Sequence, residues 1–203
     1  MSPEMFDEIV ARVGPRITKQ CINYRLPMEP GMKLAIALRH LVPGSKDRDM
    51  QFGWRVPHNT NSLLVPEVCR AVIYEYADEV MPLPTTAADW TRIADGFRDS
   101  WNFPHTLGAI DGKHIACKCP SRSGSTCFNY KKYFSVVLLA LVDSDYMFVW
   151  ADIGGRGAAP DAQLGNESDL KAATGNRDLD LQEPEALPHD TDDVPYFFIG
   201  KKI

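Results

Sequence analysis

The pattern of hydrophobic and polar positions divides the chain into a helical first part and a strand-rich second part. Apolar residues recur every three to four positions in residues 30–42 and again in about 61–80, which predicts two amphipathic helices. A shorter amphipathic stretch predicts a helix before Pro15, and residues 48–56 predict another short helix. Short helices joined by tight turns favour a helix-turn-helix domain over residues 1–80. A generic helical bundle fits the same periodicity equally well.

Pro66 falls inside the longest of these predicted helices. A proline in a helix interior removes one backbone hydrogen bond and destabilises the helix by about 3 kcal/mol. We therefore expect this helix to begin near Val65, with Pro66 in its first turn.

Residues 81–100 predict a connector that carries one more helix. Thr86 is a suitable N-cap, because a threonine side chain can accept a hydrogen bond from a backbone N–H of the first turn. The helix is expected to run through Phe97 and to end before Pro104, since the residue that precedes a proline favours an extended conformation.

From about residue 101 onward the pattern is that of strands. Residues 132–143, KYFSVVLLALVD, are nearly all apolar, which predicts a strand buried on both faces. The segment that follows its turn predicts the second strand of an antiparallel hairpin. The other expected elements are that second strand at 146–154, a helix at 161–174, an acidic surface loop at 175–195 and a short strand, PYFFIG, at 195–200.

Asp111, in the stretch GAIDGKH, admits two interpretations. An Asp-Gly pair between apolar segments is a strong local signal for a two-residue hairpin turn. The order strand, hairpin, helix, strand is instead that of a ribonuclease-H-like domain, in which the first strand and the strand after the helix lie side by side. Carboxylates on those strands can hold Mg²⁺ for phosphodiester chemistry. The local pattern alone favours the turn.

Composition adds limits on the class of protein. The net charge of the 203 residues is −5, and residues 160–203 account for −6 of it, with four Lys or Arg and ten Asp or Glu. The longest apolar run, VVLLALV, has seven residues, whereas a membrane helix needs about 20. We therefore expect no membrane span. The N-terminal residues MSPEMFDEIV have no basic start followed by an apolar stretch, so we expect no secretory signal either. Five cysteines without disulfide spacing favour a reducing compartment.

A family resemblance rests on four stretches and on the helical region before them. The stretches are LPTTAADW (83–90), FRDSWNFPHTLGAIDGKHI (97–115), PSRSGSTCFNYKKYFSVVLLALVDSDYMFVWADIG (120–154) and VPYFFIG (194–200). They resemble the PIF/Harbinger transposase-derived nucleases of the DDE superfamily. The upstream residues LAIALRHLVPG and FGWRVPHNTNSLLVPEVC resemble the N-terminal helix-turn-helix of that family, so the resemblance covers the chain from about residue 31 onward.

The resemblance implies a fold, an activity and a compartment. It implies a ribonuclease-H-like α/β core with a mixed sheet, DNA cleavage and strand transfer that depend on Mg²⁺ or Mn²⁺, and action in the nucleus. Asp111 matches the first of three metal-binding acids, and Asp161 is the best auxiliary ligand among the other acids.

The sequence departs from the family where the second acid is expected. The family has a Gly-Asp pair after the strand that matches PYFFIG, but here Gly200 is followed by Lys201. The third acid, a later glutamate, has no counterpart. We therefore expect residues 101–203 to be a C-terminally truncated, catalytically incomplete DDE domain. The alternatives are a DNA- or protein-binding module without enzymatic activity, and a non-functional fragment that folds poorly.

Basic and amide side chains supply the candidate contacts to DNA. In the second part they are interleaved with aromatic residues, which suits phosphate contact, although a solvated strand edge is the simpler interpretation. In the first part they stand at the start of a helix, where caps and turns also use such residues. The candidates are Lys113, Lys118, Arg122, Lys131 and Lys132, together with Arg55, Asn59 and Asn61.

A zinc site is the less favoured use of a further set of residues. His114, Cys117, Cys119 and Cys127 have the residue types of zinc ligands, but their spacing is not a standard one. Small cysteines that alternate on a strand also pack well against apolar neighbours.

Overall fold

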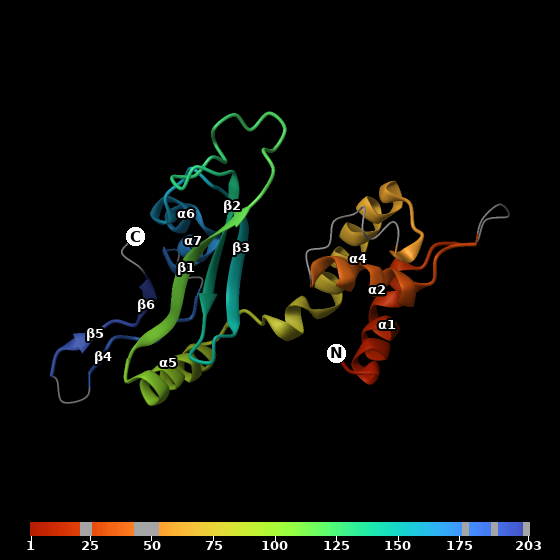
Figure 1. Cartoon of the computed structure of the whole chain (residues 1–203). Coiled ribbons are helices and arrows are strands. Elements are labelled where there is room, and N and C mark those ends of the chain that lie inside the picture. The colour runs from red at the N-terminus through yellow and green to blue at the C-terminus, as the bar shows by residue number, and fades with distance from the viewer. Residues whose placement is uncertain (21–25, 43–52, 176–178, 188–190, 201–203) are drawn as a thin grey trace. The chain divides into compact units, whose positions relative to one another are not determined.

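The computed structural model describes residues 1–20, 26–42, 53–175, 179–187 and 191–200 (Figure 1). The chain divides into two compact units, Met1–Val80 and Met81–Ile203.

The first unit packs three described helices around one apolar core. They are α1 (Pro3–Ile17), α2 (Pro30–Leu41) and α4 (His58–Val80), and each contacts the other two. Val13, Leu34, Ile36, Leu64 and Val68 are at most 3% exposed and form the centre of that core. The core therefore takes residues from all three helices at the helical spacing that the sequence displays.

A buried lysine links the three helices. Lys33 of α2 is 4% exposed, and its Nζ donates a hydrogen bond to the carbonyl of Ile17 at the end of α1. The same Nζ lies 3.3 Å from Glu67 Oε1 of α4. Because a buried charge needs both a counter-charge and hydrogen-bond acceptors, these two contacts fix where α2 lies against its neighbours.

Both proline-based boundaries predicted for the first unit are wrong. Helix α1 continues through Pro15 to Ile17, and α4 begins at His58 with Pro66 inside it. Pro15 lies in the last turn, and Leu64 buries its side chain just before Pro66. Packing of the apolar face therefore offsets the hydrogen bond that each proline removes. The helix predicted at 48–56 falls largely outside the described residues.

Helix α5 (Ala87–Trp101) opens the second unit with the predicted cap. The Thr86 side chain accepts from the backbone N–H of Asp89, and the Asp89 carboxylate accepts from the backbone N–H of Thr86. This capping box confirms Thr86 as the N-cap. Hydrogen bonds from the Thr86 side chain and backbone also lower the pKa of the Asp89 carboxyl.

A four-stranded mixed sheet forms the centre of the second unit, in the order β3-β2-β1-β6 (Figure 1). Strand β1 pairs antiparallel with β2 and parallel with β6. Strands β2 and β3 form the antiparallel hairpin that the sequence predicts. The strands are β1 (Thr106–Ala116), β2 (Ser135–Val142), β3 (Phe148–Arg156) and β6 (Phe197–Gly200).

Two short helices replace the single helix predicted at 161–174. They are α6 (Asp161–Glu167) and α7 (Asp169–Gly175). The break is at Ser168, whose backbone is extended (φ −75°, ψ 151°) and whose hydroxyl donates to the Gly165 carbonyl. A small antiparallel ribbon, β4 (Glu185–Ala186) with β5 (Asp193–Val194), also lies where the sequence predicts a loop.

The described helices of this unit cover one face of the sheet. Along β2, Val137, Leu139 and Leu141 are buried, whereas the residues that alternate with them are half-buried. The core behind the buried face joins Leu141 to Trp90 of α5 and Leu170 of α7. The prediction that this strand is buried on both faces is therefore wrong for the part of the unit that the structure describes.

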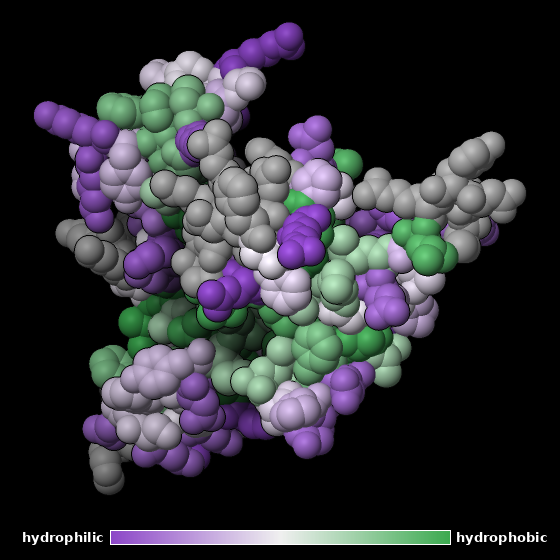
Figure 2. Space-filling model, turned by 45° about the vertical axis from the view of Figure 1, so that its right-hand side comes forward, coloured by the Kyte–Doolittle hydropathy of each residue, from purple (hydrophilic) through white to green (hydrophobic). Residues whose placement is uncertain are grey.

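Apolar side chains also reach the surface. Phe148 and Ile153 of β3 are more than half exposed. Figure 2 shows several such apolar residues, in green, among hydrophilic ones on the face in view. No helix among the described residues is long and apolar enough to cross a membrane.

Leucines on opposite faces of β2 test this one-sided core. We expect Leu141→Ala to lower the free energy of unfolding of the second unit by about 2–5 kcal/mol, because it opens a cavity in the core. Leu138→Ala, on the half-buried face, is expected to lower it by about 1 kcal/mol. Urea unfolding followed by the fluorescence of Trp90, Trp101 and Trp150 measures both. Equal losses would contradict the one-sided arrangement.

Candidate functional site

Asp111 lies inside strand β1. Its Cα is paired with that of Ala140, and the pairing with β2 runs without interruption from Ala109 to Ala116. On the other edge of β1, Ile110 pairs with Gly200 of β6. The chain does not reverse at Asp111-Gly112, so the hairpin-turn interpretation is wrong. The carboxylate instead leaves a central strand one residue beyond the point where β6 runs beside it.

The Asp111 side chain is exposed on the half-buried face of the sheet. Its antiparallel partner, Ala140, belongs to the half-buried set of β2, and opposite residues in an antiparallel pair share a face. A pocket of about 560 Å³ opens beside it. The lining comes from three segments: Asp111, Gly112, Lys113 and His114; Tyr130, Lys131 and Tyr133; and residues 157–161.

Asp161 packs directly against the backbone of Gly112. A Cβ at position 112 would lie 2.5 Å from Asp161 Oδ1, so a larger residue there would displace this carboxylate. Gly112 pairs with the buried Leu139, which places Asp161 on the helix-covered face and Asp111 on the other. Both acids nevertheless line the one pocket.

Both acids have the side-chain chemistry expected of ligands for a divalent cation. Carboxylate oxygens are the ligands that Mg²⁺ prefers, usually one or two of them together with waters and phosphates. In the part of the chain that the structure describes, no three His, Cys, Asp or Glu side chains come together to hold a metal ion. The zinc set around His114 is therefore not assembled. Lys201, where the second acid is expected, lies outside the described residues.

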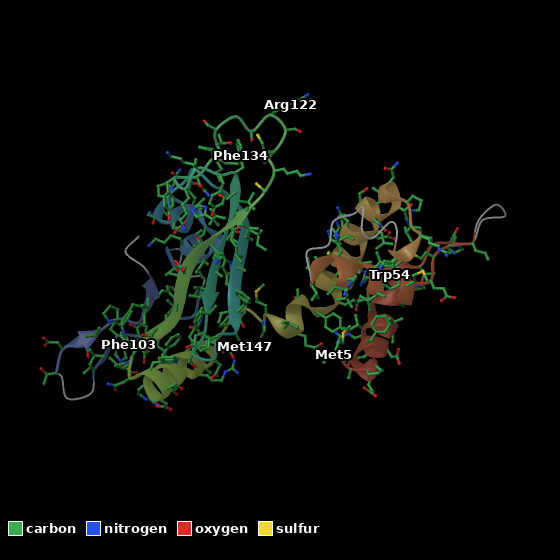
Figure 3. The ribbon with its side chains drawn as sticks, in the orientation of Figure 1. Met5, Trp54, Phe103, Arg122, Phe134 and Met147 are labelled. Carbon is green, nitrogen blue, oxygen red and sulfur yellow. The ribbon has the colours of Figure 1, made fainter. Side chains whose placement is uncertain are left out.

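The basic residues predicted around Asp111 divide into two groups. Lys113 and Lys131 line the pocket. Lys118, Arg122 and Lys132 are exposed along the loop between β1 and β2. Figure 3 shows Arg122 at the tip of that loop, at the end of the sheet away from α5. The pocket and the loop together form a surface on which the five basic residues outnumber the two acids, Asp111 and Asp161.

Asn129 holds the pocket wall in place, a role that the sequence analysis missed. The side chain is buried, and its Oδ1 accepts hydrogen bonds from the backbone N–H groups of Lys131 (3.0 Å) and Tyr133 (3.2 Å). These bonds close a turn that presents Tyr130 and Lys131, whose Nζ lies 5.4 Å from the centroid of the Tyr130 ring. The available sequence signal is an asparagine at the start of a polar turn just before an apolar strand.

The candidates in the first unit have different surroundings. Arg55 and Asn59 are exposed and line a separate pocket of about 670 Å³, which Trp54 and Leu63 also line. Asn61 is only 1% exposed, so the prediction that it contacts nucleic acid is wrong. It stands three residues before Leu64 on the face of α4 that turns toward the core.

Comparison with known proteins relates part of the chain to a known family. Residues 110–190 match the family model described as DDE superfamily endonuclease. The match starts one residue before Asp111 and takes in β2, β3, α6 and α7. Searches of curated proteins and of solved structures gave no match for the chain. The mixed sheet is compatible with the fold of a DDE nuclease.

A substitution at Gly112 tests the contact with Asp161. Gly112→Ala is expected to lower the free energy of unfolding by about 1 kcal/mol, because the new methyl group displaces the carboxylate. Gly165→Ala is the control, since its Cβ would meet nothing within 4 Å; we expect that change to be neutral or slightly stabilising.

The double variant Gly112→Ala/Asp161→Ala completes the test. It should regain most of the stability that Gly112→Ala loses, because the overlapping partner is gone. Chemical unfolding measures all of these variants. A double variant that is no more stable than Gly112→Ala would show that Asp161 does not lie over Gly112.

Proposed function

We propose that this chain is a homologue of the Harbinger-type, transposase-derived DDE nucleases that holds a DNA backbone at the Asp111 pocket. We further propose that its metal-ligand set is incomplete, so that the protein binds DNA without cleaving it. The observation that carries the proposal is the position of Asp111 on a central strand, beside β6, at the start of the segment that matches the DDE superfamily endonuclease model.

The order of the sheet supports a ribonuclease-H-like core. In such a domain the strand with the first acid lies between an antiparallel neighbour and the parallel strand that follows a helix. Strand β1 has those two neighbours, β2 and β6. A cation bound at Asp111 would stabilise negative charge on phosphate oxygens.

Local charge supports DNA as the partner. The net charge of −5 gives no overall attraction for a polyanion, so binding must come from a local patch. Lys113 and Lys131 in the pocket and Arg122 on the loop provide one. The first unit would add contacts through the exposed Arg55 and Asn59 if it acts as a helix-turn-helix. A protein that acts on chromosomal DNA in this way would work in the nucleus.

The residue after β6 supports an incomplete metal site. Gly200 pairs with Ile110, the residue before Asp111, and the next residue in sequence is Lys201 instead of an aspartate. A lysine in a ligand position repels a divalent cation, by about 8 kcal/mol for charges 4 Å apart at an effective dielectric constant of 20. Asp111 and Asp161 would hold such an ion weakly.

The apolar pocket of the first unit favours the second candidate function, a binding module without enzymatic activity. Trp54 and Leu63 are exposed apolar residues that line it, and such surfaces often bind proteins. The module would then engage a protein partner through this pocket and DNA through the second unit.

A nicking assay tests whether the metal set is complete. The full chain is expected to bind duplex DNA and to nick supercoiled plasmid only at background level in Mg²⁺ or Mn²⁺. Lys201→Asp, which supplies the missing carboxylate, is expected to raise metal-dependent nicking, and Asp111→Ala should abolish that gain. Robust nicking by the unmodified chain that is lost in Asp111→Ala would overturn the proposed incompleteness.

The salt dependence of binding tests the pocket as the DNA contact. Lys113→Ala and Lys131→Ala are each expected to weaken binding of a fluorescent duplex and to reduce the slope of log K against log salt by about 1, because one phosphate contact is lost. Lys171→Ala, an exposed lysine of α7, is the control. Anisotropy titrations at several salt concentrations measure both quantities. Equal effects at all three lysines would mean that DNA binds elsewhere or without a defined site.

A further inference from the structure

Three polar side chains beside the pocket form a chain of hydrogen bonds. Asn129 Nδ2 lies 2.9 Å from Ser135 Oγ, and Ser135 Oγ lies 3.0 Å from His114 Nδ1. Ser135 and Asn129 are buried, whereas His114 is half-buried and lines the pocket. The turn of Asn129 is thus linked through Ser135 of β2 to the imidazole ring of His114 on β1.

The orientation of the Asn129 amide follows from the backbone. Its Oδ1 accepts the N–H groups of Lys131 and Tyr133, so the oxygen faces the turn. The Nδ2 group therefore faces Ser135, and an amide nitrogen can only donate. Ser135 Oγ is thus the acceptor in the bond to Asn129.

The direction of the next bond follows from Ser135. Its hydroxyl has one hydrogen to donate, and a buried hydroxyl is destabilising unless that hydrogen finds an acceptor. Of its two side-chain partners, only His114 Nδ1 can accept. A neutral imidazole that accepts at Nδ1 carries its hydrogen at Nε2. The second nitrogen of His114 is therefore a donor.

We propose that His114 is a phosphate-binding residue, whose Nε2–H donates to a phosphate oxygen in the pocket and whose tautomer is set by Ser135 and Asn129. The inference rests on the proposed function, since the phosphate is taken to be that of a DNA backbone. An Nε2–H cannot coordinate a metal ion or accept a proton, so this tautomer assigns His114 to the anion. Lys113 and Lys131, on the same pocket, supply the positive charge that draws the phosphate in.

Nuclear magnetic resonance of the full chain tests the tautomer without any DNA. With ¹⁵N-labelled histidine at mildly alkaline pH, the ring of His114 should show a protonated Nε2 and an unprotonated Nδ1. Ser135→Ala should shift the ring toward a mixture of tautomers. Addition of inorganic phosphate should move the Nε2–H resonance of His114. A protonated Nδ1, or a resonance that phosphate leaves unchanged, would overturn the inference.

Two substitutions at His114 test the same hydrogen bond by affinity for a short duplex. The amide of glutamine reaches about as far as Nε2 and can donate there, whereas asparagine ends near Nδ1. We expect His114→Asn to weaken binding about tenfold, the usual worth of a hydrogen bond to a charged group in a partly open site, and His114→Gln to weaken it about twofold or less. Equal losses in the two variants would contradict a donor at Nε2.

The outcomes separate this inference from the proposed function. If the unmodified chain fails to bind duplex DNA but phosphate still moves the His114 resonance, the anion site stands and DNA is the wrong source of the phosphate. If DNA binds and the His114 resonance responds to neither DNA nor phosphate, the proposed function stands and the role of His114 falls. Thermal unfolding of each variant shows whether it remains folded, and the measurements on the unmodified chain do not depend on the variants.

Discussion

The hydrogen bonding of β1 on both of its edges is the constraint on which the candidate site depends. Eight residues of β1 pair with β2, and four pair with β6. A carboxylate at the tip of a hairpin would move with the turn, whereas Asp111 is paired with β2 and directly follows residues paired on both sides, so it keeps a fixed direction. Gly108 is part of this pairing. Its φ of 151° disfavours residues with a side chain, and an added Cβ would lie 2.7 Å from Leu141 Cδ1.

The sequence predicted those parts of the fold whose signals are local. Helix α2, the Thr86 cap and the hairpin of β2 and β3 follow from periodicity and from capping chemistry. Pro15 and Pro66 misled the prediction, because the packing that offsets a lost hydrogen bond comes from residues distant in sequence. The apolar run of β2 misled it too, since a run of valine and leucine does not show which face meets the helices. The Asp-Gly pair wrongly predicted a turn, because a local pattern does not show that β1 pairs with the distant strand β6.

The site was predictable in part for the same reason. Asp111, Lys113 and Lys131 come together as the sequence suggests, because they lie on β1 and on the turn that leads into its neighbour β2. The position of Asp161 against Gly112 was not predictable, because it depends on a contact between a helix end and a strand nearly fifty positions earlier. The hydrogen bonds between Asn129 and Ser135 depend on the burial of both side chains, which cannot be predicted from their residue types. Asn61 shows the converse error, in which a polar residue suited to DNA faces the core instead.

The turn that Asn129 closes is complete within a few residues. Its bonds to Lys131, Tyr133 and Ser135 involve no residue of the preceding stretch 118–124. That stretch can therefore vary in length or composition while Tyr130 and Lys131 keep their places. A change in the length or charge of this stretch would therefore reshape the outer part of the loop and leave the part of the pocket wall formed by Tyr130 and Lys131 in place.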